Sequence, residues 1–113
     1  MRFILPVPPS ANRIWRVTKT GRTYKAPEYV SWLKTAGWEV HLQRSRKEPI
    51  TGPVSLTITL PKGTRGDVDN RVKPVGDLLE ACGIVANDRQ ISTSTITRGT
   101  GEHCVVELKE LAA

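Results

Sequence analysis

A run of alternating apolar and hydroxyl side chains sets the strongest limit on how this chain can fold. The run occupies positions 54–60 and reads Val54, Ser55, Leu56, Thr57, Ile58, Thr59 and Leu60. Successive side chains of a β-strand point to opposite faces, so the run predicts a strand with one apolar and one polar face. The apolar face must therefore meet a hydrophobic core.

Two further segments place apolar residues at three- and four-residue steps, the spacing of a helix face. The first covers residues 27–46, because Pro27 suits the first turn of a helix and Pro49 interrupts the pattern. The second follows Asp67–Asn70 and ends at Gly83. Its start is typical of a helix N-cap, with Asp69 or Asn70 as the capping residue.

The remaining segments predict strands at 2–7, 90–98 and 103–109, the last two joined as a hairpin by residues 99–101. A loop or a smaller hairpin is expected with Gly21 at its tip. The length of 113 residues fits one domain. We therefore predict a single α+β domain over 1–113, with a mixed, largely antiparallel sheet packed with two helices.

Positive charge is concentrated near the start of the chain, where residues 1–27 contain no acidic side chain. The net charge is +6, and six basic residues lie in this segment: Arg2, Arg13, Arg16, Lys19, Arg22 and Lys25. We call residues 10–25 the basic arm. Such a surface is typical of phosphate binding, although basic residues also keep small domains soluble.

No stretch of the sequence is long and apolar enough to span a membrane, and no signal peptide opens it, so we expect a cytoplasmic protein. Cys82 and Cys104 lack zinc-finger spacing and are expected to be reduced thiols. His41 and His103 have no partner at the spacing of a metal site or a nucleophilic triad. The sequence also lacks the glycine-rich phosphate loops of nucleotide-binding enzymes.

The pair Asp67 and Asp69 is the clearest candidate for chemistry. In an extended backbone, residues i and i+2 point to the same side, which would bring the two carboxylates together. A cation between them relieves their repulsion, and Mg²⁺ prefers carboxylate oxygens, waters and phosphate. The alternative is that Asp69 caps the helix and Asp67 is a solvated loop residue.

Three neighbours favour the metal interpretation, and each has an alternative. Asp88, in the loop after the second helix, could be a third ligand or a turn residue. Lys73 lies one helical turn after Asp69 and could serve the same site or form a simple salt bridge. Asn70 could cap the helix, bind the metal or contact a phosphate. Asp77 and Glu80 lie further along this helix and are expected to be solvated surface charges.

Three segments of the chain match, in order and spacing, the motifs of a known family. They are residues 3–13 (FILPVPPSANR), residues 66–74 (GDVDNRVKP) and residues 83–91 (GIVANDRQI). Together these segments resemble the RusA family of Holliday junction resolvases, which are small homodimeric nucleases often encoded in phages and prophages. The resemblance extends over nearly the whole chain.

The resemblance implies that Asp67, Asp69 and Asp88 are catalytic metal ligands and that Lys73 is the functional lysine. It implies Mg²⁺ as the cofactor, with Mn²⁺ as a substitute, and branched DNA, especially four-way junctions, as the substrate. Relatives often carry an acidic residue where this chain has Asn87. The DNA-contacting positions that we expect are Asn12, Arg13, Arg16, Lys19, Arg22, Lys25, Asn70 and Arg71.

A homodimer is also implied, because two opposed strands of a junction need two sites related by two-fold symmetry. Helix 27–46 carries Trp32 and Trp38 beside its core stripe, so we expect it to form part of the dimer interface. Two alternative functions remain at this point. One is a branched-DNA-binding protein without catalysis, and the other is a metal nuclease for flaps, forks or RNA.

Overall fold

Strand β4 (Val54–Leu60) lies inside the main sheet of the computed structural model, which describes residues 1–111. Its four apolar side chains are buried and the three hydroxyl side chains between them are half-buried, as the alternation predicts. The strand order is β1 (Arg2–Leu5), β6 (Cys104–Glu110), β4 and β5 (Ile91–Arg98). Only the β4–β5 pair is parallel, so the mixed, largely antiparallel sheet is confirmed.

The predicted hairpin between the last two strands is wrong, because β4 lies between β5 and β6. Residues 99–103 instead cross the end of β4, where the Gly99 N–H donates to the Leu60 carbonyl at 2.8 Å. A Cβ atom on Gly99 would lie 2.6 Å from the Thr59 side chain, so a larger residue at this crossing would force that side chain to move. The apolar β4 gains a neighbour on each side, whereas the mostly exposed β5 forms a sheet edge.

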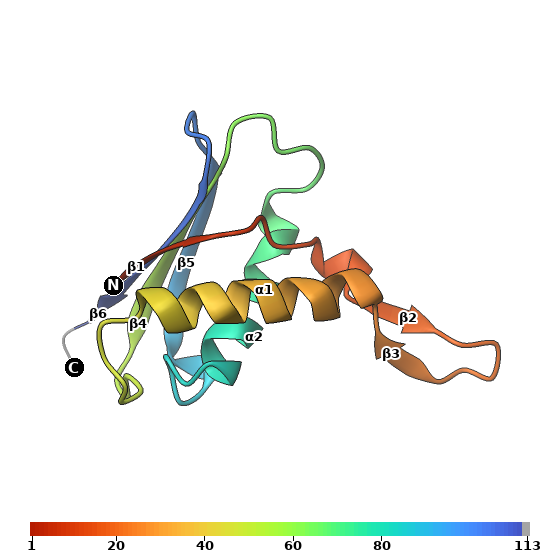
Figure 1. Cartoon of the computed structure of the whole chain (residues 1–113), viewed down its shortest axis with the longest axis horizontal. Helices are drawn as coiled ribbons and strands as arrows, with labels where there is room; N and C mark the ends of the chain where they lie inside the picture. Colours follow the sequence, from red (N-terminus) through yellow and green to blue (C-terminus); the bar gives the residue numbers. More distant parts are fainter. Residues whose placement is uncertain (112–113) are drawn as a thin grey trace.

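Both α-helices cover the same face of the sheet (Figure 1). Helix α1 (Pro27–Gln43) buries Tyr29, Trp32, Ala36 and Val40 in the core. The expectation that Trp32 lies beside the core stripe is therefore wrong. It ends three residues earlier than predicted, because the backbone of Arg44 is already extended. Helix α2 (Val72–Ala81) continues from the 3-10 turn η2 (Asp69–Arg71) and buries five residues of its own.

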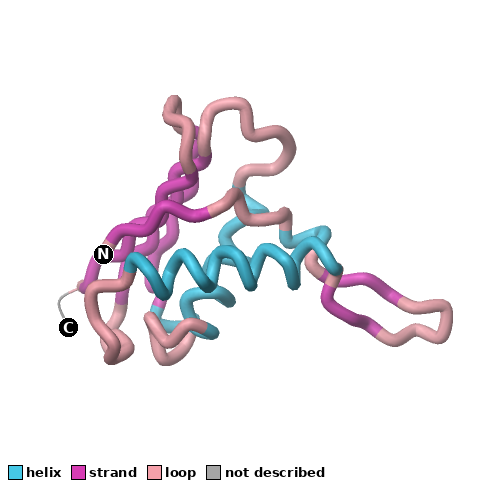
Figure 2. Tube along the Cα trace, in the orientation of Figure 1, coloured by secondary structure: helices cyan, strands magenta, loops and turns pink. Residues whose placement is uncertain are grey.

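The basic arm forms a projection from this two-layer body. After the 3-10 turn η1 (Ala11–Arg13), strands β2 (Trp15–Val17) and β3 (Thr23–Lys25) pair as the predicted hairpin. The hairpin extends beyond the start of α1, on the side away from the sheet (Figures 1 and 2). Gly21 adopts φ +88° in its turn. All six strand residues are exposed, so the hairpin adds nothing to the core.

Two apolar side chains of α1, Trp38 and Leu42, face solvent and are 62% and 60% exposed. Both cysteines are free thiols, with Cys104 buried and Cys82 only half-buried. Among residues 1–111, no helix combines the length and the apolar character of a membrane span.

Candidate active site

The Asp67–Asp69 segment leads into the second helix: Asp67 lies in the preceding loop, and Asp69 begins the 3-10 turn η2. Val68 adopts φ −82° and ψ −51°, which is helical, so the predicted extended geometry of the pair is wrong. Val68 also packs against the core, so the helical backbone begins before Asp69 at a residue that the core holds. The prediction of a side-chain cap is also wrong, because neither η2 nor α2 has a capping side chain.

Asp69 is consequently left without a structural partner. Within residues 1–111 its carboxylate accepts no hydrogen bond and joins no ion pair. Asp67 differs, because its Oδ2 accepts a hydrogen bond of 3.1 Å from the Asn70 side chain. Asn70 therefore orients Asp67 and does not cap the helix.

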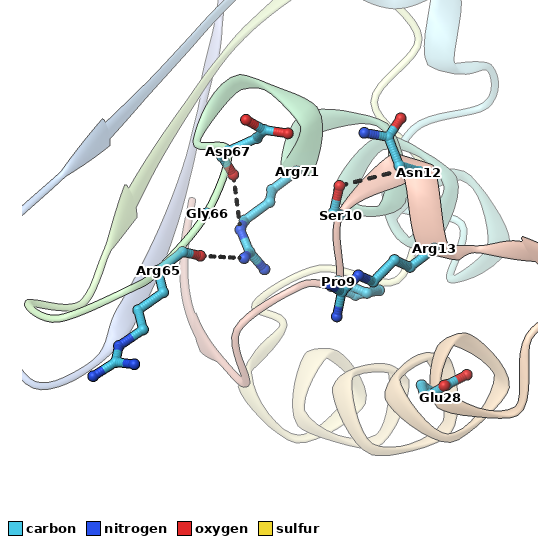
Figure 3. Close-up of a pocket in the computed structure, with 9 residues that line it drawn as sticks. All are labelled: Pro9, Ser10, Asn12, Arg13, Glu28, Arg65, Gly66, Asp67 and Arg71. Carbon is cyan, nitrogen blue, oxygen red and sulfur yellow. Dashed lines mark hydrogen bonds between the residues drawn. The ribbon is translucent and has the colours of Figure 1, made fainter.

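Arg71 holds the loop that carries Asp67. Its guanidinium donates to the backbone carbonyls of Pro8, Arg65 and Asp67 at 2.6, 2.8 and 3.1 Å. Figure 3 shows the bonds to Arg65 and Asp67. These contacts link the segment that precedes the basic arm to the start of η2. A contact between Arg71 and DNA stays a prediction, while the structure assigns the side chain to loop anchoring.

A hollow of about 500 Å³ opens beside Asp67, between residues 9–13 and residues 65–71 (Figure 3). Arg13 and Arg65 line it, and their guanidinium groups take no partner among residues 1–111. Glu28 of α1 completes the wall. Two guanidinium groups without hydrogen-bond partners among the described residues suit a DNA phosphate, because arginine matches phosphate geometry.

The outer face of α2 carries Lys73, Asp77 and Glu80. The ammonium group of Lys73 lies between two carboxylates. Its Nζ is 2.9 Å from Asp77 Oδ1 and 3.6 Å from Asp88 Oδ2. The hydrogen bond to Asp77, together with the two nearby negative charges, raises the pKa of Lys73. The structure therefore brings Lys73 and Asp88 together, and the i,i+4 partner of the lysine is Asp77, not Asp69.

Asp77 contacts Lys73 and Tyr29, which the sequence analysis did not predict. Its side chain is 30% exposed, and Oδ2 accepts a hydrogen bond of 3.0 Å from the Tyr29 hydroxyl on α1. The expectation of a solvated surface charge is therefore wrong. Glu80 is exposed as expected, but its Oε1 accepts the backbone N–H of Asp88 at 2.9 Å. The i,i+4 spacing of Lys73 and Asp77 could have indicated that pair, whereas the bonds to Tyr29 and to the Asp88 N–H depend on other elements.

The loop that presents Asp88 is fixed by a capping box. Asn87 caps η3 (Asp88–Gln90), with its side chain accepting the Arg89 N–H. The Gln90 side chain accepts from the N–H groups of Ala86 and Asn87 and donates to the carbonyls of Ile50 and Gly52. The Asn-x-x-Gln spacing is a readable capping signal, and it gives Asn87 a structural role.

The side chains of the three predicted metal ligands do not lie together as a metal-binding cluster in this structure. Within residues 1–111, no three His, Cys, Asp or Glu side chains lie close enough together to hold a metal. Neighbouring carboxylates repel one another when no cation lies between them. The donor chemistry still fits a hard divalent cation, because Asp67, Asp69 and Asp88 offer only oxygen and Asp69 has no other partner. The ligand set stays a prediction.

The candidate DNA-binding side chains of the basic arm lie in three places: the hairpin turn, the hairpin strands and η1. Lys19 and Arg22 lie in the exposed turn of the hairpin. Arg16 pairs with Glu28, and Lys25 Nζ lies 6.0 Å from the centre of the Tyr29 ring. Asn12 and Arg13 lie on η1, beside the hollow. DNA contact by these residues stays a prediction.

Comparison with known proteins identifies relatives of this arrangement. Residues 6–109 match the family model described as endodeoxyribonuclease RusA. The chain is also similar to a crossover junction endodeoxyribonuclease RusA of Aquifex aeolicus, strain VF5. The two are 36% identical over 89 residues, which cover 77% of this chain and 68% of the relative.

Proposed function

Because this chain belongs to the RusA family of endodeoxyribonucleases, we propose that Asp67, Asp69 and Asp88 hold the metal it uses to cut four-way DNA junctions. The chain is a crossover junction endodeoxyribonuclease that acts in DNA recombination and repair. A nuclease of this type requires a divalent metal. Our finer proposal is Mg²⁺, with Mn²⁺ as a substitute. The carrying observation is the family match, which spans all three aspartates and Lys73.

In this proposal, Asp67, Asp69 and Asp88 would hold the metal, and the chemistry that it would supply is activation of water and stabilisation of charge on the scissile phosphate. Neighbouring residues would hold two of these aspartates in place. Asn70 orients Asp67, and the capped loop presents Asp88. Lys73 would place its ammonium beside the phosphate and stabilise the negative charge that develops there. The uncommitted carboxylate of Asp69 is available to complete the site.

DNA would be held by the hollow and by the basic arm. Arg13 and Arg65 would bind the phosphates nearest the cut, and Lys19 and Arg22 would contact DNA further away. Each phosphate neutralised releases counterions, so binding should weaken as salt concentration rises.

We further propose that the active form is a homodimer. Two sites related by a two-fold axis can nick two opposed strands of a junction symmetrically. The exposed Trp38 and Leu42 on α1 make this helix our candidate for part of the interface. Sedimentation of the wild type and of Leu42→Glu tests the interface, which is rejected if the variant still sediments as a dimer.

Cleavage of a synthetic four-way junction tests the function. We expect paired, symmetric nicks with Mg²⁺ and none with EDTA. Asp69→Asn should lose cleavage and retain binding in a gel-shift assay. Glu102→Gln is the matched control. Glu102 lies on the loop between β5 and β6, and its exposed carboxylate forms an ion pair with Lys62. Binding without metal-dependent cleavage would favour a non-catalytic protein, and preferential cutting of flaps or forks would reassign the substrate.

A further inference from the structure

A continuous chain of side chains connects the core to Lys73. It begins at Tyr29 of α1, which is 2% exposed and donates to Asp77 Oδ2 at 3.0 Å. The other carboxylate oxygen of Asp77 accepts from Lys73 Nζ at 2.9 Å. Lys73 Nζ in turn lies 3.6 Å from Asp88. The chain therefore joins α1, α2 and η3 through polar atoms alone.

The buried end of this chain is the fixed end. Tyr29 packs in the core, so its hydroxyl has a defined position. Burial, followed by the bond to Asp77, raises the pKa of Tyr29, so the hydroxyl stays protonated and acts as donor. A carboxylate with one oxygen held in this way presents its second oxygen in a defined direction. Asp77 thus differs from an ordinary exposed i,i+4 partner, which is mobile and contributes little to stability.

Lys73 needs such a support because most of its side chain is in solvent. The side chain is 60% exposed, and a free lysine loses considerable rotamer entropy when its ammonium is fixed. Catalytic groups must nevertheless be placed to within a fraction of an ångström. The Asp77 carboxylate would restrict the Lys73 ammonium before DNA arrives. The ammonium would then stay beside the proposed site, 3.6 Å from Asp88.

We propose that Asp77 is a positioning residue, which Tyr29 orients and which in turn fixes the Lys73 ammonium beside Asp88. The inference rests on the proposed function for the role of Lys73. The geometric part, that Tyr29 and Asp77 immobilise the lysine, concerns the free protein and can be tested without DNA or metal.

The first experiment measures the mobility of the lysine directly. We would record ¹⁵N relaxation of the lysine ammonium groups in the free protein and assign Lys73 by its loss in Lys73→Arg. The Lys73 ammonium should be more ordered than the other lysines. It should become mobile in Asp77→Asn and partly mobile in Tyr29→Phe, and it should be unaffected in Glu102→Gln. Unchanged order in both variants of the chain would overturn the proposal.

The second experiment asks whether Asp77 acts through Lys73. Under single-turnover conditions, Asp77→Asn should slow junction cleavage about tenfold to a hundredfold and Tyr29→Phe about threefold to tenfold. The junction Kd should change less than about twofold. In a Lys73→Gln background, Asp77→Asn should cause no further loss, whereas a purely structural role would slow cleavage in both backgrounds.

The two experiments also separate the inference from the proposed function. If the wild type cuts no branched DNA, the function fails, and the relaxation measurement still decides whether Asp77 holds Lys73. If the wild type cuts but the losses in the two backgrounds multiply, positioning through Lys73 is rejected and the nuclease assignment stands. Tyr29→Phe removes a single oxygen, so it keeps the test valid if Asp77→Asn does not fold.

Discussion

The basic arm and the outer face of α2 carry complementary parts of the proposed activity, and they are built in opposite ways. The hairpin strands bury none of their residues, whereas α2 buries half of its length in the core. Charges in the hairpin turn face solvent, whereas those beside α2 are tied by hydrogen bonds. A mobile cation can follow phosphates through many positions, but a reacting group cannot. We infer that affinity and chemistry can be altered separately.

The largest expected effect comes from Asp88→Asn. The change keeps the shape of the side chain and its loop, but it removes a negative charge from the proposed metal site. Single-turnover cleavage of a four-way junction should fall roughly a thousandfold. The gel-shift Kd should remain within about threefold of wild type, since the screened effect of one partly exposed charge on binding is small. A parallel collapse of binding would break the proposed division between the two regions.

A double substitution in the arm, Lys19→Gln with Arg22→Gln, should produce the converse result. If each cation neutralises one phosphate, the slope of log K against log salt should become shallower by about 1.8. Affinity should fall roughly fiftyfold near 0.1 M salt, while the single-turnover rate at saturating protein stays unchanged. The matched control is Lys47→Gln with Lys109→Gln, which removes two exposed lysines outside the arm. A loss of rate at saturation would show that the arm also takes part in catalysis.

The sequence predicted the elements of the fold better than their pairing. The alternation in β4 was reliable because one face of a sheet strand must be buried. Pairing depends on contacts between distant segments, so Gly99 and Gly101 were mistaken for a hairpin turn. In space, the first of these glycines marks a close approach to Thr59. The same glycine signal therefore serves two geometries, and only the position of β4 distinguishes them.

The site shows a similar limit. Sequence reasoning assigned Asp88 and Lys73 to one site, and the structure brings their side chains to 3.6 Å. The i,i+4 spacing of Lys73 and Asp77 was readable in the sequence, but the bond from Tyr29 to Asp77 was not, because Tyr29 lies 48 positions earlier and on another helix. The Asn87 and Gln90 pair was within reach of sequence reasoning, since a capping box is a local pattern. Local signals were therefore recoverable, whereas side-chain bonds between helices were not.

Gln90 offers a test of how strongly the Asp88 loop must be held. Its amide satisfies four backbone groups on two segments. Gln90→Ala should therefore lower the free energy of unfolding by about 1–3 kcal/mol, as measured by urea denaturation. Arg89→Ala removes a neighbouring exposed side chain and should leave stability within about 0.5 kcal/mol of wild type. If both variants unfold alike, the amide contributes little and the rigidity that we assign to this loop has another source.

The smallest effect is expected at Glu28, which lies between the two regions. It pairs with Arg16 of the arm and also lines the hollow beside Asp67. A backbone hydrogen bond, helped by Arg16, keeps the pKa of Glu28 below its usual value, so the side chain is negatively charged at neutral pH. Glu28→Gln removes that charge from the path of the phosphates and releases Arg16 for DNA.

Junction affinity should consequently rise about two- to threefold at low salt, and the gain should shrink at high salt because the pair is exposed and screened. Gel-shift titrations at two salt concentrations measure both effects, with Glu102→Gln as the control for losing an exposed ion-paired carboxylate. Weaker binding would mean that the pair with Glu28 holds Arg16 in its DNA-binding position. The arm would then depend on a fixed contact with α1, and the contrast with the ordered face of α2 would be one of degree.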